Sequence, residues 1–265
     1  AKVTSDRFQM AGQDLTTRTD GKLAKLRGRD VAMIFQDPTS ALNPTLTIGR
    51  QLTEGVMRHE KLSRKDANSR AIEMLDRVGI ANPAARLTQY PHGFSGGQRQ
   101  RIMIASALMG RPGLLIADEP TTALDVTIQA QILALLGELQ SDLGLSLLLI
   151  THDLGVVAAI ADDVAVMYAG RIAERAPAAD LFAAPRHPYT QGLLAAIPVP
   201  GVTPRGSELP AIPGRVPGLI GTMQGCVFRD RCALAGPDCV NDPVPRVDTG
   251  PGHFVECVKA AKVAA

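Results

Sequence analysis

Two adjacent carboxylates, Asp118 and Glu119, follow directly after the apolar run Leu114–Ala117. A short, wholly apolar run of this kind predicts a buried strand of a parallel sheet. Open α/β sheets bind ligands at the carboxyl ends of their strands, where Asp118 is suited to holding Mg²⁺ and Glu119 to polarising an attacking water. Taken alone, the pair is equally consistent with a solvated strand end.

A second strand end carries a histidine, because His152 follows the predicted strand Ser146–Thr151. A histidine just beyond a neighbouring strand reaches the same crevice and can donate to a phosphate oxygen. The residues between the two strands keep a helical apolar period that ends at Gly144. Buried strands that alternate with helices predict an α/β fold with a mostly parallel sheet.

A serine and two glycines open an apolar-periodic helix at Ser95, Gly96 and Gly97, with Gln98 next. The free N–H groups and the dipole of a helix start favour a phosphate, and glycine lets the backbone approach it closely. An ordinary capped helix start is the alternative, and the motif is weak on its own.

Taken together and in this order, the motifs resemble the ATP-binding cassette family. They correspond to the Q-loop at Phe35–Pro38, the signature motif at Phe94–Gln98 with Phe where Leu is commoner, the Walker B strand at Leu114–Glu119, the D-loop at Thr122–Asp125 and the switch histidine at His152. The resemblance implies ATP hydrolysis with Mg²⁺ and catalytic roles for Glu119, His152 and Gln36. It implies that the nucleotide or its metal is contacted by Asp118, Ser95, Gly96, Gly97, Gln98 and Asp125.

The family also implies a P-loop NTPase-like α/β fold and a division of the chain. We expect the nucleotide-binding domain at 1–180, a helical subdomain at about 45–110, and an irregular C-terminal extension at 181–265, where Pro and Gly recur after Ile197. A capping-box pattern at Ser63–Asp66 marks a helix start inside the subdomain.

Two further segments, Gln36–Pro44 and Pro185–Leu194, resemble the oligopeptide, dipeptide and nickel importer branch. This resemblance implies an ATPase that drives uptake of di- or oligopeptides, with nickel as the alternative cargo. The implied partners are a second cassette, identical or similar, two transmembrane permease subunits and an extracytoplasmic peptide-binding protein. Because no apolar run is long enough to cross a bilayer, we expect a peripheral protein on the cytoplasmic face of the membrane.

The phosphate-cradling motif G-x-x-x-x-G-K-[ST] is not found in the sequence, since Gly21-Lys22 lacks both the upstream glycine and the following Ser or Thr. In the family this Walker A loop precedes the Q-loop. Two interpretations stay open. The loop lies upstream of Ala1 in a longer chain, or the protein is a non-catalytic partner that offers its signature motif to an intact sister subunit.

Composition argues against a nucleic-acid partner. The net charge is +2, aromatic residues make up 3% and Trp is absent, so neither a basic footprint nor a base-stacking platform is expected. Cassette proteins that act on DNA or ribosomes usually carry long coiled coils or two cassettes, and neither is visible in these 265 residues.

The four cysteines, Cys226, Cys232, Cys239 and Cys257, all lie in the last fifth of the chain. Crowded thiols in a cytosolic protein indicate a metal site before disulfides. Their spacing lacks a C-x₂-C pair and leaves Zn²⁺ and an iron–sulfur cluster both open. The importer branch is known for a four-cysteine tail that holds a 4Fe-4S cluster, so the resemblance implies such a cluster on these residues.

Overall fold

The computed structural model describes residues 5–122, 124–198, 203–204, 206, 208–218, 221, 223–241 and 243–260. The chain divides into two compact units, Ala1–His152 (unit 1) and Asp153–Ala265 (unit 2). Within the described ranges, no helix combines the length and the apolar character needed to cross a membrane. The domain boundary expected near residue 180 stays a prediction.

Unit 1 is built around a three-stranded parallel sheet in the order β3-β4-β5, which confirms the predicted parallel α/β arrangement. The strands are β3 (Val31–Ile34), β4 (Leu114–Asp118) and β5 (Ser146–Ile150). Ile34 pairs with Ala117, and Asp118 pairs with Ile150, so the carboxyl ends of all three strands lie at the same end of the sheet. A small hairpin of β1 (Gln9–Met10) and β2 (Gln13–Asp14) and a short helix, α1 (Asp20–Ala24), precede this sheet.

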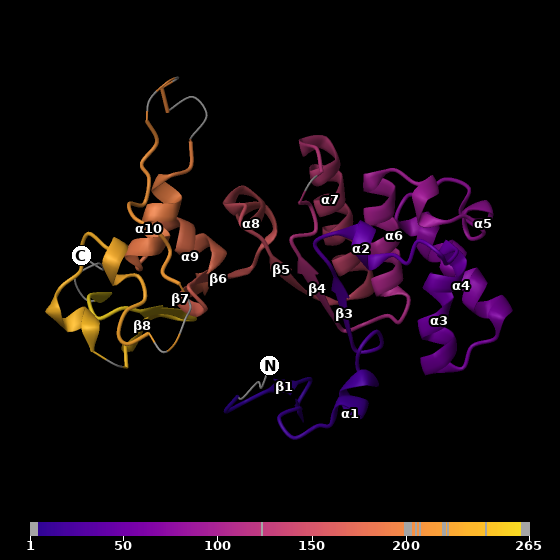
Figure 1. The fold of residues 1–265 in the computed structure, drawn as a ribbon, viewed down its shortest axis with the longest axis horizontal. Coiled ribbons are helices and arrows are strands. Elements are labelled where there is room, and N and C mark those ends of the chain that lie inside the picture. The colour runs from indigo at the N-terminus through magenta and orange to yellow at the C-terminus, as the bar shows by residue number, and fades with distance from the viewer. Residues whose placement is uncertain are drawn as a thin grey trace. The chain divides into compact units, whose positions relative to one another are not determined.

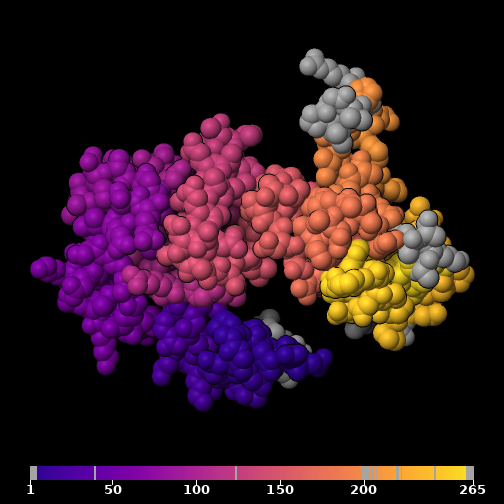
Figure 2. Space-filling view, turned by 180° about the vertical axis from the view of Figure 1, so that it is seen from behind, coloured from indigo at the N-terminus to yellow at the C-terminus, as the bar shows by residue number. Residues whose placement is uncertain are grey.

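Helices of unit 1 pack on one another and on this sheet (Figure 1), where α6 lies beside β3 and α3 and α4 lie farther out. They are α2 (Pro38–Ala41), α3 (Ile48–Glu60), α4 (Arg64–Arg77), α5 (Pro83–Arg86), α6 (Gly96–Leu108) and α7 (Val126–Leu143), with a 3₁₀ turn at Pro91–Gly93. Figure 2 shows α3 to α6, in purple to magenta, as one continuous surface with α7. The shared core explains this continuity, because Leu75, Ile104, Leu115 and Leu136 are all buried in it.

Local sequence signals set the helix ends of unit 1. The Ser63 side chain accepts a hydrogen bond from the backbone N–H of Asp66 and so caps α4 at its predicted start. Gly144 ends α7 with a φ of 62°, a left-handed conformation that glycine adopts without steric cost.

Unit 2 holds an antiparallel sheet in the order β6-β7-β9-β8. Its elements are α8 (Leu154–Ile160), β6 (Asp163–Tyr168), β7 (Arg171–Pro177), α9 (Ala178–Ala183), α10 (Pro188–Ala195), 3₁₀ turns at Arg229–Arg231 and Pro237–Val240, β8 (Arg246–Gly250) and β9 (His253–Glu256). Much of the described chain after α10 is irregular, as expected. Its last part nevertheless adds β8 and β9, which the sequence analysis did not anticipate, and β9 pairs directly with β7.

Candidate active site

The backbone at Glu119 turns sharply where β4 ends. Glu119 has a φ of 43°, a left-handed conformation that is unfavourable for a residue with a side chain. Its backbone N–H donates to the carbonyl oxygen of Ile150 at 2.9 Å, at the end of the neighbouring strand β5. The parallel sheet therefore fixes the backbone from which the Glu119 carboxylate projects.

Three side chains bind this carboxylate. Thr122 Oγ1 donates to Glu119 Oε2 at 2.7 Å, and Gln36 Nε2 donates to the same oxygen at 2.9 Å. His152 Nδ1 lies 3.1 Å from Glu119 Oε1. These partners follow β3, β4 and β5 in turn, so the structure brings together Gln36, Glu119 and His152 from the ends of three adjacent strands.

The hydrogen bonds keep Glu119 charged. The hydrogen bond from Thr122, followed by that from His152, holds the pKa of the Glu119 carboxyl below its usual range, and partial burial opposes this only in part. The Glu119 side chain is 26% exposed and the His152 side chain is 78% exposed. An ionised carboxylate that is open to solvent can accept a hydrogen bond from a water and polarise it.

Asp118 and Asp125 flank this group along the chain. Asp118 is the last residue of β4, is half-buried and lies opposite Ile150. Asp125 accepts a hydrogen bond from the backbone N–H of Ile128 at 2.9 Å and so caps α7. Ala123, which belongs to the predicted D-loop, lies outside the described residues.

The Ser95–Gln98 segment forms a complete capping box at the start of α6. Ser95 Oγ accepts from the Gln98 backbone N–H at 3.3 Å, and Gln98 Oε1 accepts from the Ser95 N–H at 3.0 Å. A side chain at Gly96 would meet open space, whereas a β-carbon at Gly97 would lie 3.0 Å from Cγ2 of Ile128. The helix start therefore presents an open face beside a tight contact with α7.

Two polar contacts near the site were not foreseen from the sequence. Thr122 was assigned to the D-loop motif, but its hydroxyl binds Glu119. Gln100 is fully buried, and its Nε2 donates to the carbonyl oxygen of Pro120 at 2.6 Å. A glutamine on the inward face of an apolar helix is a signal for such a bond, although its partner cannot be read from spacing.

The cysteines share one neighbourhood in unit 2. Burial raises the pKa of the Cys226, Cys232 and Cys257 thiols, and electrostatic repulsion from Cys239 raises the pKa of each of them further. The backbone N–H of Cys226 donates to the carbonyl oxygen of Cys239 at 2.8 Å. Across the described ranges, no three His, Cys, Asp or Glu side chains are placed as a ready metal-ligand set.

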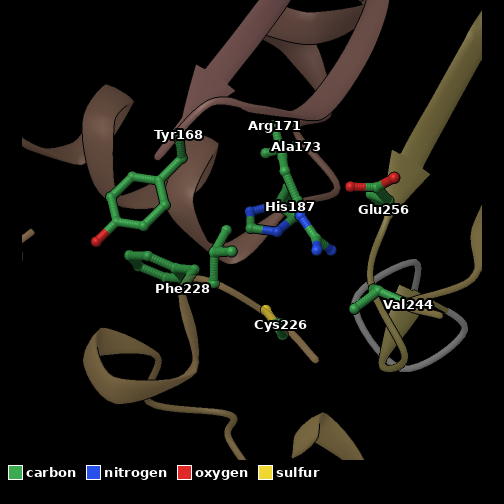
Figure 3. A pocket seen from close by; sticks show the side chains of 9 residues that line it. Tyr168, Arg171, Ala173, His187, Cys226, Phe228, Val244 and Glu256 are labelled. Carbon is green, nitrogen blue, oxygen red and sulfur yellow. The ribbon is translucent and has the colours of Figure 1, made fainter. Parts of the chain in front are cut away.

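A small cavity in unit 2 adjoins Cys226 (Figure 3). Arg171, His187, Phe228 and Glu256 also line it. His187 Nδ1 accepts a hydrogen bond from the Tyr189 N–H at 3.0 Å. Burial lowers the pKa of His187 to about 4, which keeps the ring neutral at ordinary pH.

A second carboxylate–histidine pair is buried in the sheet of unit 2. Glu174 on β7 is fully buried, and its Oε1 lies 2.8 Å from Nε2 of His253 on β9. The same carboxylate accepts backbone N–H bonds from Arg186 at 2.7 Å and from His187 at 2.9 Å. Sequence analysis missed this cluster, which ties β7, β9 and the chain before α10 together.

Comparison with known proteins adds two matched regions. The profile of the ABC transporter family matches residues 1–122, and that of the oligopeptide/dipeptide transporter C-terminal region matches residues 173–239. The dipeptide transport ATP-binding protein DppD of Bacillus subtilis is 55% identical over 232 residues, which are 88% of this chain and 69% of that relative.

Solved structures match part of the chain. A dimeric ATP-binding cassette in a post-hydrolysis state, bound to ADP and Pi, superposes with a TM-score of 0.57 and 26% identity over 64% of this chain and 72% of its own. The cbiO1 protein of Clostridium perfringens, part of the ABC transporter complex cbiONQ, superposes with a TM-score of 0.58 and 30% identity over 68% of both chains.

Proposed function

The chain belongs to the ATP-binding proteins of peptide-importing ABC transporters, and from this premise we propose how its residues drive ATP hydrolysis. Glu119 orients and polarises the water that attacks the γ-phosphate. The observation that carries this proposal is the ionised, partly exposed Glu119 carboxylate at the end of β4, held by Thr122, Gln36 and His152. Its low pKa suits a group that must be charged before it meets water.

The partners of Glu119 have roles of their own in this proposal. Gln36 and His152 each bind one oxygen of the Glu119 carboxylate, so they set its orientation before nucleotide binds. With ATP bound, His152 would donate to a γ-phosphate oxygen, and Gln36 would respond to the γ-phosphate and its metal. Thr122 stays on Glu119, because it belongs to the same turn.

The carboxylates fit a bound Mg²⁺. This ion usually takes one or two carboxylates together with substrate phosphates, and Asp118 and Glu119 offer two carboxylates at one strand end. When bound, Mg²⁺ would neutralise charge that develops on the phosphates. Asp118 would hold it, directly or through water.

The phosphate cradle belongs, in our proposal, to a further segment of the full-length protein. Strand β5 forms an edge of the three-stranded sheet of unit 1, and its residues Leu148 and Ile150 are exposed, as is Met33 on β3. Parallel sheets are normally covered on both faces. A further segment that covers these apolar side chains would also supply the Walker A loop. The exposed side chains therefore favour an intact cassette over a partner subunit that lacks this loop.

A second cassette completes the site. The capped start of α6 at Ser95, with open space at Gly96, suits a phosphate approached from another subunit. We propose that Ser95, Gly96, Gly97 and Gln98 act on nucleotide held by that partner, while Asp125 positions the start of α7 beside it. Two transmembrane permease subunits would hold this peripheral protein at the cytoplasmic face of the membrane, and an extracytoplasmic binding protein would deliver the peptide.

Substituting the signature serine tests this arrangement. In the full-length protein, Ser95→Arg places bulk and charge where the phosphate should dock, so ATP-dependent dimerisation should be lost. Ser63→Arg is the matched control, because Ser63 is also an exposed serine cap, at the start of α4. Both variants lose a helix cap. If Ser95→Arg dimerised with ATP as the Ser63→Arg protein does, the role in trans would be wrong.

We also propose that the four cysteines bind a 4Fe-4S cluster, with Zn²⁺ as the alternative. The electrostatic influence among the thiols supports one shared site, although some rearrangement is needed before they can act as ligands. The cluster would fasten a Pro- and Gly-rich extension that has few apolar residues to pack. Iron, sulfide and visible absorbance should be measured after purification without oxygen. Zinc without iron would exclude the cluster, and no metal would exclude the site.

A further inference from the structure

One buried hydrogen bond links α6 to the turn that carries Glu119. Gln100 lies in α6 with 1% of its surface exposed, and its Nε2 donates to the carbonyl oxygen of Pro120 at 2.6 Å. Pro120 directly follows Glu119 in the chain. The Gln100 amide therefore holds the peptide unit next to the proposed catalytic residue.

The turn depends on this support. Proline has no backbone N–H, so Pro120 cannot donate a hydrogen bond of its own. Thr122 closes the turn through its backbone N–H to the Glu119 carbonyl at 3.1 Å, and Glu119 itself is held at an unfavourable φ. Strained backbone of this kind persists only where its surroundings fix it.

A second contact makes the link stiff. A β-carbon at Gly97 would lie only 3.0 Å from Ile128, so the first turn of α6 packs closely on the first turn of α7. Helix α6 therefore contacts the chain at Pro120, just after β4, and again at Ile128, in the first turn of α7. A displacement of the start of α6 should therefore shift Glu119 as well, because tightly packed interfaces transmit displacement.

We infer that Gln100 is a positioning residue that couples the signature end of α6 to Glu119 of the same subunit. The inference rests on the proposed function, in which Ser95 engages nucleotide held by the partner cassette. Gln100 lies on the same helix as Ser95, so docking of the partner's ATP adjusts the carboxylate that acts on this subunit's own ATP. The two nucleotide sites of the dimer communicate through this bond.

Removal of the amide tests the inference in the full-length chain, assembled with its partner cassette and permeases. Gln100→Leu keeps the side-chain size and loses the donor. We expect kcat for ATP to fall about tenfold or more, because small displacements of a catalytic group are costly, while KM stays within about twofold. Gln100→Asn keeps an amide one methylene short, and its kcat should lie between the two.

A matched control separates positioning from loss of stability. Thr53 on α3 is also buried and donates its hydroxyl to a backbone carbonyl, that of Gly49, at 2.7 Å. Thr53→Val removes that bond within unit 1 and should leave kcat unchanged. An equal fall in kcat for Thr53→Val would overturn the inference, because general loosening would then explain both variants.

The double variant decides which nucleotide site Gln100 serves. If Gln100 acts through its own Glu119, adding Gln100→Leu to Glu119→Gln should not reduce the residual turnover further. A further loss would overturn the inference, because Gln100 would then act through the signature motif on the partner's site. Parental kcat in Gln100→Leu alone would also overturn it. Parental turnover in Glu119→Gln would instead contradict the proposed function.

Discussion

The two units of this protein each contain a glutamate paired with a histidine, in opposite surroundings. In unit 1, Glu119 and His152 lie 3.1 Å apart, with 26% and 78% of their side chains exposed. In unit 2, Glu174 and His253 lie 2.8 Å apart, with 0% and 7% exposed. The same pair of side chains therefore occurs once at an open strand end and once inside a sheet.

The partners of the two carboxylates explain the difference. Glu119 is held in part by the side chains of Gln36 and His152, which can rotate away when a ligand arrives. Glu174 is held by the backbone N–H groups of Arg186 and His187, which cannot move without moving the chain. An exchangeable set of partners suits chemistry, and a fixed set suits the joining of strands, so we assign the first pair to catalysis and the second to structure.

The largest effect should come from Glu119→Gln. Removal of a water-orienting carboxylate should lower ATP turnover on the order of 10²–10⁴-fold, because the amide cannot polarise water in the same way. ATP binding and thermal stability should stay close to those of the parent. Steady-state hydrolysis and equilibrium ATP binding by the full-length, assembled protein measure both. Glu138→Gln, at an exposed position on α7, is the control, and near-parental turnover in Glu119→Gln would contradict the assignment.

Substitution in the buried pair, Glu174 and His253, should lower the stability of the folded protein. Glu174→Leu leaves the imidazole of His253 and two backbone N–H groups without their hydrogen-bond partner, and each buried donor left unsatisfied costs about 1–3 kcal/mol. Urea unfolding of the full-length protein gives the free energy. The same substitution at exposed Glu138 should change it by less than about 0.5 kcal/mol. Equal effects would mean that burial does not distinguish the two carboxylates.

Sequence patterns predicted unit 1 better than unit 2, for a physical reason. Strands β4 and β5 and the helix that ends at Gly144 follow from local apolar periods, and motif order placed Gln36, Glu119 and His152 at the ends of strands. Contacts such as that of Gln100 with Pro120 depend on how helices pack, which no local pattern encodes. Glu174 and His253 are 79 residues apart, and strand β9 is short, so their pairing could not be inferred from either segment alone.

A third expected effect is a loss of folding stability at acidic pH. Burial lowers the pKa of His187 to about 4 in the folded protein, below its ordinary value of 6.5. The unfolded chain therefore takes up a proton first as pH falls, so this stability is present above pH 6.5 and is lost between 6.5 and 4. The loss should approach about 3 kcal/mol for a shift of this size. Unfolding free energies across this pH range measure it.

His187→Asn should flatten that acid dependence. Asparagine can accept the hydrogen bond at the start of α10, as His187 Nδ1 does, but it does not titrate. His59→Asn removes an exposed histidine near the end of α3 and should leave the pH curve unchanged. A curve of parental shape in His187→Asn would mean that another group controls the acid response.

The smallest expected change is the stability effect of His152→Asn, and it bears most directly on the comparison of the two pairs. Because the His152 side chain is 78% exposed, its contact with Glu119 should contribute little to the free energy of unfolding. His253→Asn, at the buried counterpart, should cost several times more, because Glu174 would lose its partner inside the sheet. Turnover should follow the opposite order, with a large loss for His152→Asn and little for His253→Asn at temperatures where the protein stays folded. If His152→Asn destabilised the protein as much as His253→Asn, the open pair would be structural as well, and the contrast between the two units would fail.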